Sequence, residues 1–363
     1  MIIIAGGGIA GLSLAWNLAK RGEKITLIER DFIGSGASWA ATAYLEPRLG
    51  TGAMRALEWA AIKAWPGFIA DLEHNAGTPI DHRKNGQMRL AFSENLNIVK
   101  SDAETRQAQG WNIEWLEDSQ VHTHEPHLSS RVIAAAFLPD VHWVNARLLC
   151  KALATAITKA GGTIIERQKI TGILHEHGRV SGVTTSHTTI NANRVVLATA
   201  MGTNSINGLP PEFPECRAVK GTILSLGMDK NSPIITHLLR HPNGHVLAPR
   251  SDGRLLVGST HEDDETSPDV SMENRQQLKQ SAIDLLPEAA NLPVIEATSG
   301  IRALIGDGAL RLGTTTTYKG LYYSLSHAGA GFLRAPTIAE QFADFILDPE
   351  APCQWIDRFL HRG

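Results

Sequence analysis

The stretch Ile2–Glu29 decides the fold, and it reads IIIAGGGIAGLSLAWNLAKRGEKITLIE. It starts with a short apolar run, which is typical of a strand buried on both faces of a parallel sheet. Gly6, Gly8 and Gly11 then satisfy the pattern G-x-G-x-x-G, and apolar residues recur after them at helical spacing. A second apolar strand ends in Glu29, about 18 residues after Gly11, where the motif requires an acid. This order predicts a βαβ unit that binds a dinucleotide.

Each residue of the motif has a physical role in binding the dinucleotide. Gly6 permits the tight turn, Gly8 lets the backbone approach a pyrophosphate, and Gly11 lets the helix pack closely on the strand. The positive end of the helix attracts the phosphates. Glu29 can accept hydrogen bonds from ribose hydroxyls.

Composition sets the class of protein. The 363 residues have room for two or three domain-sized units, and 43% of them are hydrophobic. A net charge of −3 argues against a nucleic-acid partner. No run reaches the roughly 18 apolar residues of a membrane span, and Ile2–Ala5 is too short for a signal peptide. Cys150, Cys216 and Cys353 are few and widely spaced, which predicts reduced thiols and a cytoplasmic location.

Three histidines near the middle of the chain superficially suggest a metal site. His122, His124 and His127 follow the spacing His-x-His-x-x-His, but Pro126 breaks any helix that would align their rings. We therefore expect a solvated loop and no bound metal.

Two later stretches also fit a nucleotide fold. Residues 194–200 form a near-continuous apolar strand that ends in Thr199 and Ala200, followed by Gly202, as a strand would that finishes against a bound nucleotide. A second glycine-rich strand-to-helix turn spans His327–Phe332, and we expect a helix from Pro336 to Ile346 after it. The turn offers a second helix N-terminus to an anion or an electron-rich ring.

These pieces, in this order, resemble the glycine/D-amino-acid oxidase family of FAD-dependent amine oxidoreductases over nearly the whole chain. The sequence is similar in its overall pattern to the thiamine-pathway glycine oxidases. It is also similar to the oxidoreductase half of the bifunctional tRNA wobble-uridine methylaminomethyl enzyme, in Thr260–Leu278 and after His327. The most specific segments are Ile2–Glu29, Gly36–Ser38, Val195–Ala200, Pro249-Arg250, Gly253–Thr260, Gly300–Arg302 and His327–Phe332.

The resemblance implies an α/β protein, a Rossmann-like FAD-binding domain with an inserted, mainly antiparallel β-sheet substrate domain. We expect FAD-binding segments at residues 1–85, 141–210 and 299–363. Residues 86–140 and 211–298 would form the substrate domain.

The resemblance also implies the cofactor and its contacts. FAD would bind noncovalently, because no Cys stands at the family's flavin-linking positions. Backbone amides of the second glycine turn would face the flavin pyrimidine edge, where a helix dipole helps hydride transfer. The implied cofactor residues are Gly6, Gly8, Ile9, Ala10, Gly11, Glu29, Arg30, Ser38, Ala40, Ala41, Thr42, Ile170, Thr199, Ala200, Gly202, Arg302, His327, Gly329, Ala330, Gly331 and Phe332.

Arg302 matches the family's substrate-carboxylate clamp in its Gly-x-Arg context, since a guanidinium fork fits a carboxylate through two parallel hydrogen bonds. An ordinary ion-paired arginine is the alternative.

The sequence departs from the family pattern at three positions. Ala303 replaces the usual Pro, Gly306 stands where the family has a Pro before Asp-Gly, and Val246 replaces a Tyr that commonly helps hold the carboxylate. His245 or Tyr44 would then have to substitute. His327 could tune the flavin or simply cap its strand.

The resemblance implies oxidative deamination of a small carboxylate-bearing amine, of glycine or D-amino-acid type, by hydride transfer to flavin N5. Oxygen or another acceptor would then reoxidise the flavin. One alternative is a tRNA-modifying oxidoreductase that cleaves a carboxymethylamino group. Others are a flavoprotein with a different amine substrate and a redox protein whose substrate site has decayed. Whether the chain forms a homo-oligomer stays open.

Overall fold

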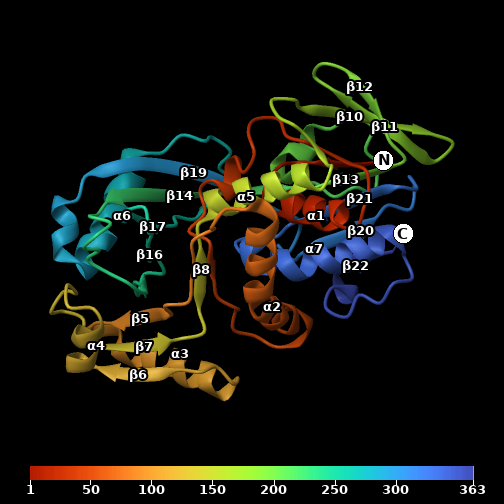
Figure 1. Cartoon of the computed structure of the whole chain (residues 1–363). Coiled ribbons are helices and arrows are strands. Elements are labelled where there is room, and N and C mark those ends of the chain that lie inside the picture. The colour runs from red at the N-terminus through yellow and green to blue at the C-terminus, as the bar shows by residue number, and fades with distance from the viewer. Residues whose placement is uncertain (363) are drawn as a thin grey trace.

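The computed structural model describes residues 1–362. The chain folds into two blocks that lie side by side (Figure 1). Both termini belong to one block, which holds the glycine-rich N-terminal unit. The other block is built around a large sheet from the middle of the chain, with α2 (Gly52–Ala76) and β8 (His142–Val144) between the two.

A seven-stranded sheet forms the core of the first block, in the order β22-β20-β21-β13-β1-β2-β9. The five strands from β21 to β9 run parallel, and every residue of β1 and β2 is buried. This confirms the predicted βαβ unit, in which two apolar strands flank α1. The strands are β1 (Ile2–Ala5), β2 (Ile25–Ile28), β9 (Thr163–Ile165), β13 (Arg194–Leu197), β20 (Arg311–Thr314), β21 (Leu321–Leu325) and β22 (Leu360–His361).

Four helices pack together beside this sheet. α1 (Ile9–Ala19) contacts both α7 (Gly331–Leu347) and α5 (Ala146–Lys159), and α2 contacts the same two helices. Their apolar faces bury large aromatic side chains, including Trp16 on α1. These contacts join the beginning and the end of the chain, so residues more than 300 positions apart line one site.

The second block contains a nine-stranded sheet in which every pairing is antiparallel except that of β15 with β5. The predicted mainly antiparallel substrate-side sheet is therefore confirmed. Its strands are β5 (Gln87–Ala91), β6 (Glu114–Glu117), β7 (Ala134–Leu138), β14 (Arg217–Gly227), β15 (Leu238–Arg240), β16 (Val246–Pro249), β17 (Arg254–Gly258), β18 (Glu262–Asp263) and β19 (Val294–Leu304).

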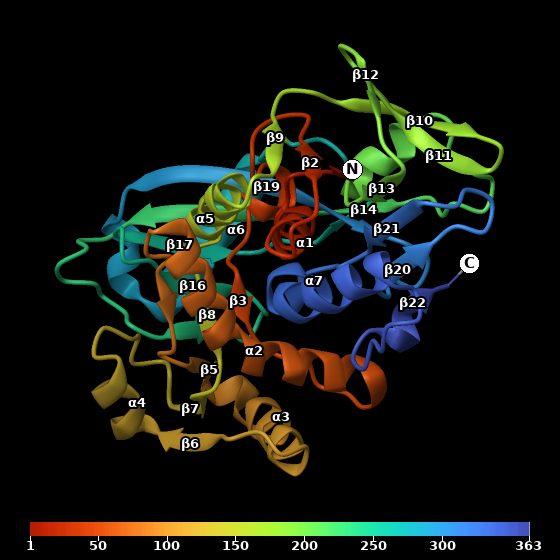
Figure 2. The ribbon, with the colours of Figure 1, turned by 45° about the vertical axis from the view of Figure 1, so that its right-hand side comes forward.

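Two small sheets accompany the large ones. One joins β3 (Tyr44–Leu45), β8 and β4 (His82–Arg83) at the junction between the blocks. The other is a meander of β10 (Ile170–Glu176), β11 (Arg179–Thr185) and β12 (Thr189–Asn191), which projects beside the first block (Figure 2). The predicted five-segment division stays a prediction, and β19 crosses its boundary between residues 298 and 299.

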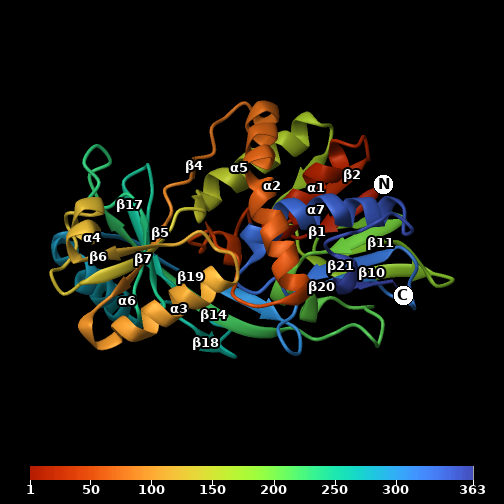
Figure 3. The same cartoon turned by 90° about the horizontal axis from the view of Figure 1, so that it is seen from below.

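Three helices belong to the second block: α3 (Leu96–Ala108), α4 (Asp118–His124) and α6 (Met272–Leu285). Seen from below, they lie at the opposite end of the molecule from α1 and α7 (Figure 3). Within residues 1–362, none of the helices combines the length and apolar character that crossing a membrane requires.

The predicted histidine loop is wrong in part. His122 and His124 lie on α4, which ends at His124, just before Pro126. Only His127 lies in the chain after the helix. His122 Nε2 lies 3.2 Å from the Val132 carbonyl oxygen, and His127 Nδ1 lies 2.8 Å from Glu288 Oε1. The histidines thus face separate partners, and the described residues contain no cluster of side chains suited to a metal ion.

Candidate active site

The first glycine turn leaves β1 at the edge where the parallel strands end. Gly6 has φ +104°, and a Cβ there would lie 2.4 Å from the Ala198 carbonyl oxygen. A Cβ on Gly11 would lie 2.0 Å from the Gly6 carbonyl oxygen, so only glycine lets α1 start this close to the strand. Gly8 differs, since a Cβ there would meet only Ser38 Oγ, at 3.2 Å. Gly6 and Gly11 thus shape the turn, and Gly8 leaves open space above it.

Glu29 ends β2 beside this turn and is buried. Its carboxylate accepts hydrogen bonds from the amides of Gly7, at 2.6 Å, and Asp31, at 2.9 Å. It also lines the larger cavity described below. The side chain therefore holds the turn in shape while it faces the space where a ribose would lie.

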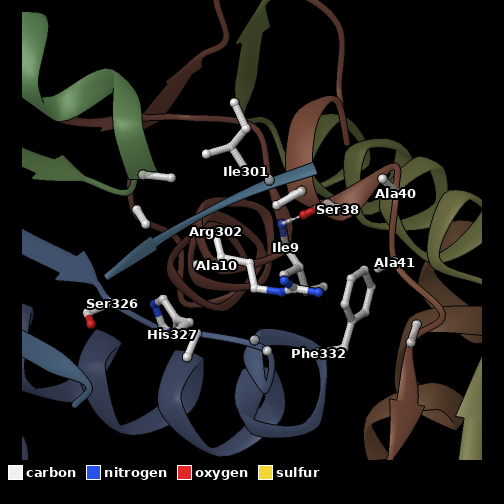
Figure 4. Close-up of a pocket in the computed structure, with 18 of the residues that line it drawn as sticks. Ile9, Ala10, Ser38, Ala40, Ala41, Ile301, Arg302, Ser326, His327 and Phe332 are labelled. Carbon is white, nitrogen blue, oxygen red and sulfur yellow. Dashed lines mark hydrogen bonds between the residues drawn. The ribbon is translucent and has the colours of Figure 1, made fainter. Parts of the chain in front are cut away.

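Two adjoining cavities of about 500 Å³ and about 230 Å³ share Gly8, Ser38 and Ile301 among their lining residues. Together they form a slot that extends from Glu29 past the start of α1 to Phe332. The predicted residues along the larger one are Gly6, Gly8, Glu29, Arg30, Ser38, Ile170, Thr199, Ala200 and Gly202. Along the smaller one they are Gly8, Ile9, Ala10, Ser38, Ala40, Ala41, Thr42, Tyr44, Ala200, Arg302, His327, Gly329, Gly331 and Phe332 (Figure 4).

The second glycine turn closes the slot from the other side. We predicted the helix to begin at Pro336, but α7 begins at Gly331 and runs through Pro336. The first turn of α7 therefore lies in the glycine turn itself, with Phe332 on the cavity wall. Proline at the sixth helical position has no N–H and costs the helix one backbone hydrogen bond, and the packing of α7 against α1 and α2 offsets that loss.

His327 precedes this turn. Burial lowers the pKa of its imidazole to about 4, so the ring is neutral near pH 7. Its Nε2 lies 3.0 Å from Ser324 Oγ. Nδ1 is buried and has no hydrogen-bond partner within residues 1–362.

A buried ion pair supports the turn from behind. Arg334 Nε donates to Glu58 Oε1 at 2.9 Å, and both side chains are at most 2% exposed. Glu58 Oε2 also accepts from the Arg48 amide at 2.7 Å, and Arg334 Nη1 reaches the His327 carbonyl oxygen at 3.4 Å. The pair therefore connects α2, the chain after Pro47 and the flank of the glycine turn.

We expect Glu58→Gln to lower the free energy of unfolding by about 2 kcal/mol, because the amide weakens a charge-assisted hydrogen bond to a buried guanidinium. Urea unfolding followed by circular dichroism measures the change. Glu94→Gln is the matched control, because Glu94 pairs with Arg131 at the surface, where an ion pair contributes little. Equal stability of both variants would contradict the structural role of the Glu58–Arg334 pair.

Arg302 enters the smaller cavity from β19. A Cβ on Gly300 would lie 2.8 Å from Ala37 Cα, so glycine lets β19 pass closely here. The guanidinium lies over Gly221 of β14, and its Nη2 donates to Ser259 Oγ at 2.6 Å. No carboxylate of the described chain lies within ion-pair distance of it, and burial lowers its pKa. Arg302 is thus a partly buried cation whose remaining donors face the cavity (Figure 4).

The structure brings Tyr44 and His327 to the same cavity as Arg302 but leaves His245 outside it. His245 Nδ1 lies 2.8 Å from Ser281 Oγ of α6. Successive side chains of an extended chain point to opposite sheet faces, and Val246 packs in the apolar cluster that includes Ile223 and Tyr44. The expectation that His245 could replace the family's Tyr is therefore wrong. Gly11 and Ala330 also lie outside the cavity lining and shape the two turns from within.

Sequence reasoning missed Ser259 and the Glu58–Arg334 pair. Ser259 lies in the segment Gly253–Thr260, which carries the family resemblance, so a hydroxyl next to the clamp could have been suspected. Glu58 and Arg334 are 276 positions apart, and no local pattern joins them.

The residues of the slot fit FAD. Neither Gly8 before α1 nor Ala330 before α7 provides a capping side chain. The Ile9 amide at the start of α1 donates to Ser38 Oγ at 3.0 Å, and the other amides of the two first turns, with the positive dipole ends of the helices, remain available to the slot. Phosphate oxygens suit the first end, and the electron-rich pyrimidine edge of a flavin suits the second. The unpartnered His327 Nδ1 offers a further polar contact.

Comparisons with known proteins agree with this cofactor. The family model DAO, described as FAD dependent oxidoreductase, matches residues 1–345. The glycine oxidase of Bacillus licheniformis is 29% identical over 365 residues, which cover 98% of this chain and 95% of the relative.

Solved structures give the same result. The crystal structure of glycine oxidase from Bacillus cereus superposes with a TM-score of 0.91 at 25% identity, over 100% of this chain and 98% of that one. L-proline dehydrogenase from P. horikoshii shares the fold, with a TM-score of 0.84 at 22% identity, over 99% and 96% of the two chains. The chain belongs to the DAO family and is an FAD-dependent oxidoreductase with glycine oxidase homologues.

Proposed function

We propose that this enzyme oxidatively deaminates a small amine that carries a carboxylate, of glycine or D-amino-acid type. The observation that carries the proposal is Arg302, a cation without a carboxylate partner in the described chain, in the cavity beside the second glycine turn. A buried guanidinium without an anion is costly, and a substrate carboxylate removes that cost. Relatives named glycine oxidase support a substrate of this size.

FAD, when bound, supplies the hydride acceptor, so the protein has only to bind and orient the amine. Arg302 would hold the carboxylate, and Ser259 Oγ would keep the guanidinium turned into the cavity. The free amides at the start of α7 would stabilise negative charge that develops on the cofactor's pyrimidine edge. His327 is neutral near pH 7, so the stabilisation would come from these amides and the helix dipole rather than from an imidazolium.

Tyr44 remains the proposed second contact for the substrate carboxylate. It lines the cavity with Arg302, whereas Val246 offers no polar atom. Oxygen as the electron acceptor and a cytoplasmic location stay predictions.

The test is an anaerobic screen in which the flavin absorbance of the holoenzyme is followed after mixing with glycine, sarcosine, D-amino acids and cyclic imino acids. Bleaching by at least one of them is expected. Methylamine and ethylamine, which lack the carboxylate, serve as controls and are expected to react far more slowly. If none of the amino acids bleaches the flavin, the proposed function fails.

We further expect acid precipitation to release all the flavin into the supernatant, because no cysteine lines either cavity and none is placed to form a thioether with the flavin. Cys150, Cys216 and Cys353 are buried and line neither cavity, and burial raises the pKa of Cys150 to about 12 and that of Cys216 to about 11. Flavin absorbance of the pellet and the supernatant measures the result. Yellow protein in the washed pellet would contradict noncovalent binding.

A further inference from the structure

A cluster of charged side chains lies beside the smaller cavity, outside the site described so far. It consists of Arg89, Arg106 and Arg240 with Glu46 and Asp102. Arg106 Nη1 lies 3.1 Å from Glu46 Oε1, and Arg106 Nε lies 2.9 Å from Asp102 Oδ2. Arg89 pairs with both carboxylates. Three guanidinium groups thus share two carboxylates, which leaves one formal positive charge in excess.

Arg240 is the least closely paired of the three guanidinium groups. Its Nη1 lies 3.8 Å from Glu46 Oε2, beyond hydrogen-bond distance, and its side chain is 26% exposed. Glu46 already has closer partners in Arg89 and Arg106, so Arg240 can turn to another anion without leaving Glu46 unpaired. The positive charges of the cluster act on one another. Burial and the two neighbouring guanidinium groups lower the pKa of Arg89, and Glu46 opposes this effect.

Tyr44 connects this cluster to the site. Arg240 Nη1 lies 3.5 Å from the Tyr44 hydroxyl, and Tyr44 lines the cavity that contains Arg302. Glu46 follows Tyr44 by two positions, just beyond β3, and Arg240 contacts both side chains. Arg240 also faces Val246 across the β15–β16 pair, and that valine brings no polar group of its own. One phenol thus lies near two cations, of which Arg302 has no carboxylate partner in the described chain and Arg240 has only the 3.8 Å contact with Glu46.

We propose that Arg240 forms a second anion subsite beside Tyr44, and that the preferred substrate is an amine bearing a second carboxylate. This inference rests on the proposed function of the same cavity. Arg302 binds the carboxylate next to the reacting carbon, and Arg240 binds the one on the side chain or on the nitrogen substituent. The second carboxylate neutralises the excess charge of the cluster, which a monocarboxylate leaves in place.

The experiment compares substrates that differ mainly in one charge, using the holoenzyme: D-aspartate with D-asparagine, and iminodiacetate with sarcosine. We expect kcat/KM for the diacid to exceed that for its neutral partner by about tenfold or more, as one charge-assisted hydrogen bond provides. Arg240→Gln should bring this ratio close to one, and Arg240→Lys should restore part of it. Arg131→Gln, outside the cluster, is the matched control and should leave the ratio unchanged.

A second readout does not depend on turnover. Titration of the oxidised holoenzyme with malonate and succinate, against acetate, is followed through the flavin absorbance. The diacids should bind about tenfold more tightly, and Arg240→Gln should remove the difference. If amines reduce the flavin with no preference for diacids, the subsite is overturned while the proposed function stands. If diacids bind through Arg240 but no amine reduces the flavin, the proposed function fails and the subsite stands.

Discussion

Replacing Arg302 by alanine is expected to lower kcat/KM for the amine substrate about a hundredfold, or by about 3 kcal/mol of transition-state stabilisation. The reason is geometric. The guanidinium reaches the cavity from β19, is held by Ser259 Oγ at 2.6 Å, and lacks a carboxylate partner in the part of the chain that the structure describes. Alanine removes both hydrogen bonds of the fork and the orientation that they impose.

The FAD content of Arg302→Ala should survive, because the turns that shape the cofactor slot belong to α1 and α7 rather than to β19. Arg302→Lys should retain part of the activity, since an ammonium keeps the charge but cannot bind a carboxylate through a planar fork. Arg179→Ala, an exposed change on β11, is the control. Steady-state kinetics with the best substrate of the anaerobic screen measures all three. Unchanged kinetics in Arg302→Ala would remove the substrate-anchoring argument.

The parts of the fold that local sequence determines can be predicted from the sequence. The unit Ile2–Glu29 contains its own strands, turn and helix, so its pattern alone predicted β1, α1 and β2. The start of α7 is not predictable in this way. Pro336 is typical of a first helical turn, whereas α7 begins at Gly331, where Gly331, Leu333 and Arg334 contact α1 and α2. Tertiary contacts decided the position.

In the site, too, local patterns predict some residues, and others come together only through tertiary contacts. Arg302 was found through its Gly-x-Arg context, but its partner Ser259 is brought near by the pairing of β14 with both β17 and β19, which no local pattern predicts. His245 was misplaced because a single residue of register decides which face of a sheet a side chain occupies. The Arg240 cluster assembles residues from β5, β15, α3 and the chain after β3, so it became visible only in the folded molecule.

The second large effect is expected at Gly8. Gly8→Val should abolish FAD binding and yield colourless protein, because Gly8 lines both cavities directly in front of the α1 amides. The Gly8→Val substitution is expected to affect FAD binding and to leave the fold intact. Gly8 has φ −78° and ψ 179°, which valine adopts without strain, and a Cβ would meet only Ser38 Oγ at 3.2 Å. The valine methyl groups would therefore occupy the space that a pyrophosphate needs.

Flavin absorbance per polypeptide and titration of the apoprotein with FAD measure the effect, and we expect the dissociation constant to rise at least about a hundredfold. Gly67→Val is the matched control, since Gly67 is exposed on α2 with open space around its Cβ position. Thermal unfolding of the apo forms separates lost binding from misfolding, and Gly8→Val should melt close to the wild-type apoprotein. Gly11→Val should instead unfold, because its side chain would collide with the Gly6 carbonyl. A yellow, fully loaded Gly8→Val protein would mean that the phosphates bind elsewhere than at this turn.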